Sequence, residues 1–246
     1  MKKRTIIRII ILIVLIAVLG VLIKLYCDEI NSQNSEISTS DNRPEMGEQM
    51  GQPGGGDNSS SVTKTGATEF TSDVTESSKG YESTESDENA ILVKDGANVN
   101  MSDSTVNKSS GDSTNVENSE FYGVNAGVLV ESNSTATLKN LKINTSVKGA
   151  NAVFSTGTDS KIYISDSEIT TTKDSSRGLD ATYGGYIEAD NVTISTQGGS
   201  CATLATDRGE GTVIAKNSKL STAGKGSPVI YSTGDITLKD STGTAT

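Results

Sequence analysis

The chain has 246 residues, a formal net charge of −10 at pH 7, and neither histidine nor tryptophan. A net charge of this sign argues against nucleic acid and anionic lipid as partners of the exposed part of the chain. The absence of histidine excludes Ser-His-Asp and Cys-His catalysis and histidine-ligated zinc. The two cysteines, Cys27 and Cys201, lie in different segments, which excludes a disulfide framework.

Residues 1–26 have the pattern of a membrane anchor. A basic tip precedes an uncharged, almost wholly aliphatic run from Ile9 to Ile23, which Arg8 and Lys24 flank. Because the flanking side chains can extend to the interface, the segment reaches about 20 residues, enough to cross a bilayer. The basic tip is expected to stay cytoplasmic. The sequence therefore predicts a single-pass cell-membrane protein whose remaining residues are extracellular.

Two other interpretations of this segment stay open. A cleaved signal peptide would release a secreted protein, although no small-x-small cleavage site follows the apolar run. A lipid on Cys27 would anchor the chain instead, although the preceding Tyr26 is bulky. Residues 27–61 have low complexity and no apolar periodicity, which predicts a disordered, flexible linker.

Residues 62–246 repeat with a period near 25. The repeat reads apolar-x-apolar-x-[Asn/Asp]-x-x-apolar, and the intervals between its Asn/Asp positions are 37, 26, 25, 26 and 23 residues. Copies of the repeat begin at Val99, Ala136, Ile162, Ile187, Val213 and Ile236. A fixed period of this length is typical of a solenoid.

Each period contains three short strand-like pieces, which are too short to pair usefully with one another. Stacked about 4.8 Å apart, they pair with the periods above and below. The sequence therefore predicts an all-β fold, a right-handed single-stranded parallel β-helix with three short parallel sheets and about 25 residues per turn.

Alternation within the strands predicts which side chains form the core. The first sheet is expected to contribute Ala90, Leu92, Ala126, Val128, Ala152, Phe154, Ala181, Tyr183, Ala202 and Leu204. The second and third sheets are expected to contribute Val99, Met101, Leu138, Ile162, Ile164, Ile187 and Val213, and Val106, Ile143, Ile169, Ile194 and Leu220. A structural ladder of stacked side chains with inward parity is expected from the repeat's polar positions, Asp103, Asn140, Asp166, Asn191 and Asn217.

Several short sequence segments resemble those of a known family. They are Ser72–Ser77, Asp87–Val93, Glu120–Ala126 and Tyr231–Ile236. Residues 62–246 resemble the right-handed parallel β-helix proteins, and more narrowly the carbohydrate-binding or adhesin-like β-helices of Gram-positive anaerobes. Within this fold, residues 66–77 are expected to form the N-terminal cap, with Phe70 as its plug. The chain stops within a turn and has no polar cap, which predicts a truncated C-terminal end.

The 37-residue interval contains an insertion, Gly111–Gly123. Insertions in solenoids often project as loops and carry binding sites. Calcium is a candidate ion for this loop, with Asp112, Glu117 and Glu120 as its oxygen ligands, and Phe121 or Tyr122 is a candidate contact for a sugar. The alternative is a solvated surface loop whose two aromatic side chains pack against the neighbouring turn.

Two tyrosines of the second sheet are expected to point outward on adjacent turns. Tyr163 and Tyr186 alternate with inward residues, and Lys161 and Glu188 lie beside them. Exposed rings on a flat face stack on sugars, and neighbouring charges bind hydroxyl groups. Ordinary cross-strand pairing on an exposed sheet is the alternative interpretation.

Charged residues also gather in glycine-rich turns. They are Asp174, Arg177, Asp180, Asp207, Arg208 and Glu210. Polysaccharide lyases with this fold use calcium-binding carboxylates and an Arg or Lys base, whereas surface ion pairing is the simpler interpretation. We therefore expect a monomeric, non-catalytic surface protein that binds polysaccharide or mediates adhesion. A calcium-dependent pectate-type lyase and a purely structural stalk are the alternatives.

Overall fold

The computed structural model describes residues 62–246. The predicted membrane anchor (1–26) and linker (27–61) lie outside the described residues. Between residues 62 and 246, no helix has the length and apolar character needed to span a bilayer.

The described residues form three parallel sheets, which we name A, B and C. Sheet A consists of β1 (Thr65–Phe70), β4 (Glu88–Val93), β7 (Val128–Val130), β10 (Val153–Thr156), β13 (Leu179–Thr182), β16 (Leu204–Thr206) and β19 (Ile230–Tyr231). Sheet B consists of β2 (Val74–Ser77), β5 (Asn98–Ser102), β8 (Thr135–Lys139), β11 (Lys161–Ser165), β14 (Tyr186–Asp190), β17 (Thr212–Lys216) and β20 (Asp235–Lys239). Sheet C consists of β3 (Gly80–Ser83), β6 (Thr105–Lys108), β9 (Lys142–Thr145), β12 (Glu168–Thr171), β15 (Thr193–Thr196), β18 (Lys219–Thr222) and β21 (Thr242–Ala245).

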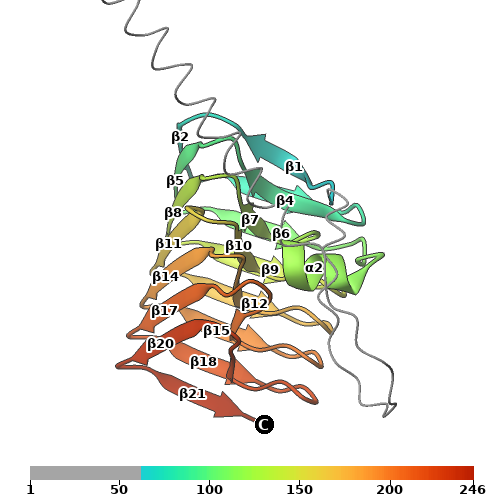
Figure 1. Ribbon diagram of the computed structural model, residues 1–246, viewed down its shortest axis with the longest axis vertical. Coiled ribbons are helices and arrows are strands. Elements are labelled where there is room, and N and C mark those ends of the chain that lie inside the picture. Colours follow the sequence, from blue (N-terminus) through green and yellow to red (C-terminus); the bar gives the residue numbers. More distant parts are fainter. Residues whose placement is uncertain (1–61) are drawn as a thin grey trace, which may run out of the picture. The chain divides into compact units, whose positions relative to one another are not determined.

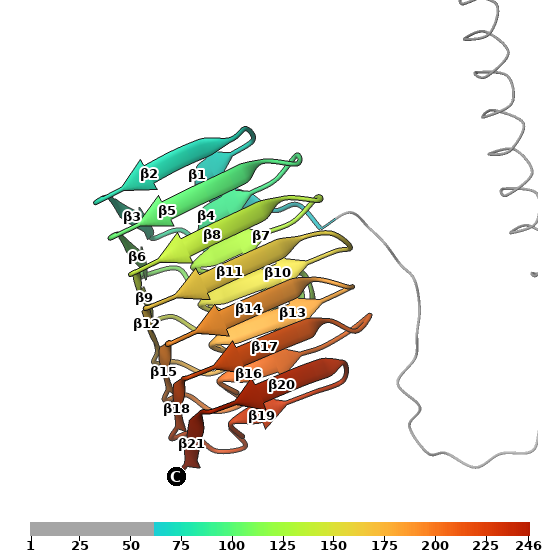
Figure 2. The same ribbon diagram turned by 90° about the vertical axis from the view of Figure 1, so that its left-hand side faces the viewer.

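Each turn contributes one strand to each sheet, and each strand pairs in parallel with its counterpart in the next turn (Figures 1 and 2). The seven strands of each sheet define seven turns. The repeat positions are in register, as in the pairs Ile162–Ile187 and Ile187–Val213. The predicted fold is confirmed at this level: an all-β parallel β-solenoid of the right-handed type with three sheets.

The core lies between the three sheets. All the inward residues predicted for sheets B and C belong to it, from Val99 to Val213 in sheet B and from Val106 to Leu220 in sheet C. In the first turn, Phe70 packs against this core and contacts the Tyr81 ring edge-on at a centroid distance of 6.2 Å.

The prediction for sheet A is wrong in part. Its core positions include Ile91, Val93, Val130, Val153 and Leu179, which were not predicted. Three residues predicted to be inward form a separate cluster with Leu129 instead: Leu92, Ala126 and Phe154. Strands β4, β7 and β10 have buried residues on both faces, so alternation could not show which face is internal.

The polar corner between sheets B and C is exposed, so the predicted inward parity of its residues is wrong. Asp103, Asn140, Asp166, Asn191 and Asn217 all have positive φ, between 51° and 56°. This left-handed conformation turns the side chain away from the core, and Asn and Asp tolerate it better than most residues do.

Hydrogen bonds along this corner occur in pairs. The Asn140 side chain donates to Asp103 at 2.7 Å, and that of Asn191 donates to Asp166 at 2.8 Å. Asn217 reaches Asp190 instead, at 2.7 Å. The inward polar position is the following residue, a buried serine in three turns: Ser104, Ser167 and Ser218.

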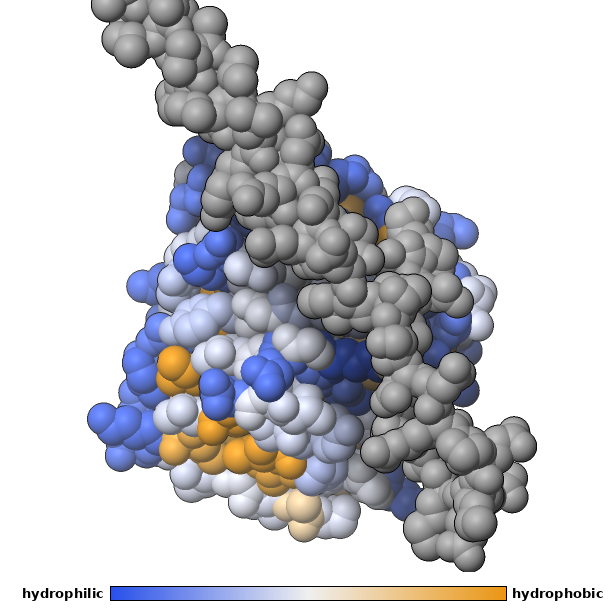
Figure 3. Space-filling view, in the orientation of Figure 1, coloured by the Kyte–Doolittle hydropathy of each residue, from blue (hydrophilic) through white to orange (hydrophobic). Residues whose placement is uncertain are grey.

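The part of the surface visible in Figure 3 is mostly polar, with an apolar area toward the last turns. The large hydrophobic side chains with the highest exposure in residues 62–246 are Tyr163, Ile230 and Tyr231.

Candidate functional site

Tyr163 of β11 and Tyr186 of β14 lie together on the outer face of sheet B. Tyr163 pairs with Glu188 and Lys161 with Tyr186, so the two rings occupy diagonal positions on adjacent turns. Their centroids are 6.0 Å apart, with an interplanar angle of 55°. Tyr163 is 40% exposed and Tyr186 is half-buried. We call these two residues the tyrosine pair.

Charged groups orient one member of the tyrosine pair. The Tyr186 hydroxyl donates to Glu188 Oε2 at 2.9 Å, and Lys216 Nζ donates to Glu188 Oε1 at 2.6 Å. The hydrogen bond from Lys216, and then that from Tyr186, lower the pKa of Glu188. Burial and the Glu188 carboxylate raise the pKa of Tyr186 to about 12. At neutral pH, Glu188 is therefore ionised and holds the Tyr186 ring in place.

Lys161 lies next to the tyrosine pair, with its ammonium group 3.8 Å from Asp159. Lys216 belongs to the same face but was not predicted. The sequence indicated its direction, because Lys216 directly follows the inward Ala215 in the fifth copy of the repeat and neighbouring side chains of a strand point to opposite faces.

The second half of the insertion is a helix packed on sheet A, so its prediction as a projecting loop is wrong there. Helix α2 (Val116–Tyr122) begins after Asn115, whose side chain accepts from Glu117 N, and ends at Gly123 with φ 72°. A Cβ on Gly123 would lie 2.6 Å from both Leu129 and Phe154. The outer apolar cluster of sheet A is therefore covered by the end of α2.

The two aromatic residues of the insertion pack against neighbouring turns. The Tyr122 ring stacks on Tyr183 at a centroid distance of 5.6 Å, and the Arg208 guanidinium lies 3.8 Å from the centroid of Phe121. The backbone oxygen of Phe121 also accepts a hydrogen bond from Thr182 at 2.9 Å. These contacts attach α2 to the solenoid. They agree with the packing of the aromatic pair in the alternative interpretation, although the segment is a helix and not a solvated loop. Tyr183, predicted to lie in the core, serves this attachment instead.

The three candidate calcium ligands do not converge. Asp112 accepts the backbone N–H of Lys148 at 2.9 Å, while Glu117 lies in the first turn of α2 and Glu120 near its end. In the part of the chain that the structure describes, no group of three acidic or cysteine side chains is arranged to hold a metal ion. The geometry therefore gives no support to a calcium site in the insertion.

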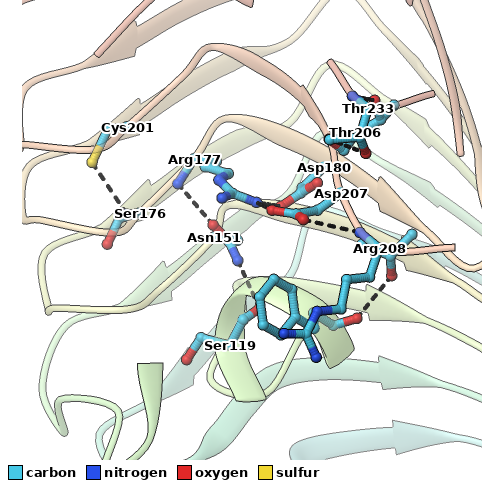
Figure 4. Close-up of polar contacts among 12 residues, drawn as sticks. Ser119, Asn151, Ser176, Arg177, Asp180, Cys201, Thr206, Asp207, Arg208 and Thr233 are labelled. Carbon is cyan, nitrogen blue, oxygen red and sulfur yellow. Dashed lines mark hydrogen bonds and ion pairs between the residues drawn. The ribbon is translucent and has the colours of Figure 1, made fainter. Parts of the chain in front are cut away.

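The charges predicted to pair at the surface include a buried cluster on the outer face of sheet A (Figure 4). Arg177 Nη1 lies 2.7 Å from Asp180 and 3.0 Å from Asp207, and all three side chains are almost fully buried. The Arg177 backbone N–H donates to Asn151, whose amide donates to Ser119 O of α2 at 2.9 Å. The prediction of exposed ion pairs is thus wrong for these three residues.

Burial dominates the electrostatics of this cluster. It raises the pKa of Asp180 to about 6, although Arg177 acts in the opposite direction, and Asp207 and Glu120 raise the pKa further. Asp180 Oδ1 has no hydrogen-bond partner. Because Asp180 has no solvent exposure, it cannot contact a polymer in this conformation. The cluster's polar contacts join turns to one another and to α2.

No protein-family model matches the chain, and neither curated proteins nor solved structures show significant similarity to it. The structure supports the β-solenoid fold that the resemblance implied, and the comparisons give no support for a family or a source. Among the residues predicted to bind a ligand, the structure brings together Tyr163, Tyr186, Lys161 and Glu188, and it places Phe121 and Tyr122 elsewhere, in the attachment of α2.

Proposed function

We propose that this chain is a non-catalytic β-solenoid that binds a polysaccharide through the tyrosine pair of sheet B. The observation that carries the proposal is the pair of neighbouring rings, 6.0 Å apart on consecutive turns, with an exposed Tyr163. Rings exposed on a flat sheet offer apolar faces to sugar rings, and polar groups beside them fix the orientation of the ligand.

The spacing of the turns supports a polymer as the ligand. Adjacent turns lie about 4.8 Å apart, so groups on the outer face recur along the solenoid axis. The outward column of Tyr163 also contains Asn100, Thr137, Glu188, Ile214 and Thr237. The polar side chains of this column supply hydrogen bonds for sugars beyond the two that contact the rings.

Localisation is part of the proposal and rests on sequence alone. Residues 1–26 would anchor the chain in the cell membrane, and residues 27–61 would hold the solenoid away from its outer surface. In that position the tyrosine pair would meet surface or dietary polysaccharides, and binding would serve adhesion.

Affinity electrophoresis of the whole chain in neutral detergent micelles tests the proposal. Gels containing single polysaccharides should retard the protein for at least one neutral polymer. The double variant Tyr163→Ala/Tyr186→Ala should lose most of this retardation, since it removes both ring faces that are available to sugars.

Tyr231→Ala is the matched control, because it removes a tyrosine of similar exposure, 43%, from sheet A. Equal retardation of the double variant and the wild-type protein would refute the assignment of the site. Release of ultraviolet-absorbing unsaturated uronides from pectin would instead establish the lyase alternative.

A further inference from the structure

A groove runs along the edge where sheet C passes into sheet A. It crosses the connections that follow β9, β12, β15 and β18, and its volume is about 860 Å³. Its lining includes three lysines, Lys148, Lys173 and Lys225, and two aspartates, Asp112 and Asp174. We call it the lysine groove.

The two aspartates of the lysine groove are engaged by backbone amides. Asp112 Oδ1 accepts the N–H of Lys148 at 2.9 Å, and Asp174 Oδ1 accepts the N–H of Gly199 at 2.7 Å. In contrast, no carboxylate of residues 62–246 lies within ion-pair distance of the three lysine ammonium groups. The lysines are exposed, so their charges are available to a ligand.

The floor of the lysine groove is backbone. A Cβ on Gly224 would lie 1.7 Å from the carbonyl oxygen of Gly198, and one on Gly198 would lie 2.1 Å from that of Lys173. The turns stack closely here because they have no side chains in between. Their amides bond from turn to turn, as from Ser200 N to Lys225 O at 3.0 Å. The backbone amides of the floor are therefore hydrogen-bonded within the protein, and the groups that can recognise a ligand are the lysine side chains.

The lysines lie on different turns. Backbone hydrogen bonds connect Gly149 to Asp174, Ser175 to Gly199 and Ser200 to Lys225, which places Lys148 and Lys225 in one column, three turns apart. At about 4.8 Å per turn, they are separated by roughly 14 Å along the axis, with Lys173 between them. The lysines therefore follow one another along the groove at intervals of one turn and then two turns, so that an extended chain with anionic groups along its length can contact all three.

We infer that the lysine groove binds a linear acidic polysaccharide, one that carries carboxylate or sulfate groups along its length. This site is separate from the tyrosine pair, and its ligand class differs from that of the proposed function. The net charge of −10 repels polyanions from the rest of the chain. Binding of a polyanion should therefore be confined to the lysine groove and should weaken as the salt concentration rises.

The test uses the whole chain in neutral detergent micelles with three polymers: polygalacturonate, dextran sulfate and uncharged dextran. The wild-type protein should bind at least one polyanion at low ionic strength and lose it on addition of salt, while dextran remains unbound by the groove. Lys148→Gln/Lys173→Gln/Lys225→Gln should weaken this binding about tenfold. Binding of polygalacturonate alone assigns carboxylates as the ligand groups, and binding of dextran sulfate alone assigns sulfates.

Lys142→Gln/Lys219→Gln/Lys239→Gln is the matched control, because it removes the same charge from exposed positions outside the groove. This control and Tyr163→Ala/Tyr186→Ala should bind the polyanion as the wild-type protein does. Equal weakening by both lysine variants would overturn the inference in favour of non-specific attraction. So would failure of the wild-type protein to bind either polyanion, or loss of binding in the tyrosine variant.

Discussion

Asp180 carries a carboxyl group that has no solvent exposure and shares Arg177 with Asp207. Its pKa is raised from 3.8 to about 6, chiefly by burial. The folded state therefore holds this proton more tightly than the unfolded state does. The resulting contribution to stability is complete below about pH 4 and is lost as the pH rises through about 6.

Asp180→Asn should remove this dependence. Between pH 4 and pH 6.5, the thermal midpoint of the wild-type protein should fall relative to that of the variant, by an amount equivalent to on the order of 2 kcal/mol. Asp73→Asn is a control of opposite sign, because hydrogen bonds from Asn98 lower the pKa of Asp73. Parallel curves for the wild-type protein and Asp180→Asn would contradict the burial argument.

Gly123 combines a positive φ with a close approach to Leu129 and Phe154. Gly123→Ala should lower the free energy of unfolding by about 2 kcal/mol, because the added methyl group meets both strain and side-chain contact. Gly96→Ala separates these causes, since Gly96 has φ 78° and no neighbouring atom within 4 Å of the added Cβ. Chemical denaturation should show the larger loss for Gly123→Ala, and equal losses would exclude the contact.

The corner residues show how far a single position can be predicted. The repeat revealed Asp103, Asn140 and their counterparts as structural residues, but strand parity assigned them the wrong direction. Parity applies only while the backbone stays extended, and a single residue at φ near 55° ends that pattern. The preference of Asn and Asp for this conformation was the available signal.

At the scale of elements, strands with one polar face were predictable and strands with two apolar faces were not. Sheets B and C alternate cleanly, so their core residues followed from the sequence. Helix α2 packs on the outer apolar cluster of sheet A, where the strands have consecutive apolar residues such as Ile91, Leu92 and Val93. The helix itself had a cap signal at Asn115 and another at Gly123, but seven residues are too few to suggest a stable helix.

Because α2 is so short, its order should depend on the surface beneath it. Phe154→Ala removes a fully buried ring from the outer cluster of sheet A and should cost about 3–5 kcal/mol. Hydrogen exchange should then speed up first at residues 116–122, while the strands of the last turns keep their protection. Unchanged protection of α2 in this variant would mean that the helix is held by its polar contacts alone.

At the scale of the whole molecule, the period of about 25 residues determined the architecture. Each turn contacts the turn above and the turn below, so a repeated pattern is enough to predict the stack. Ligand sites were less predictable, because they depend on side chains from several turns. The tyrosine pair followed from parity within two neighbouring copies, whereas the lysine groove and the Arg177 cluster depend on the alignment of glycine-rich connections, which have no such parity.

Polysaccharide binding by the outer face of sheet B can be tested in a single experiment. A glycan array probed with the whole chain, and in parallel with Tyr163→Ala/Tyr186→Ala, tests it most directly. The wild-type protein should give signal on one class of neutral polymer, and this signal should be retained by Tyr231→Ala and lost in the double variant. A blank array from folded, β-rich wild-type protein, or the same signal from the double variant, would contradict polysaccharide binding at the tyrosine pair.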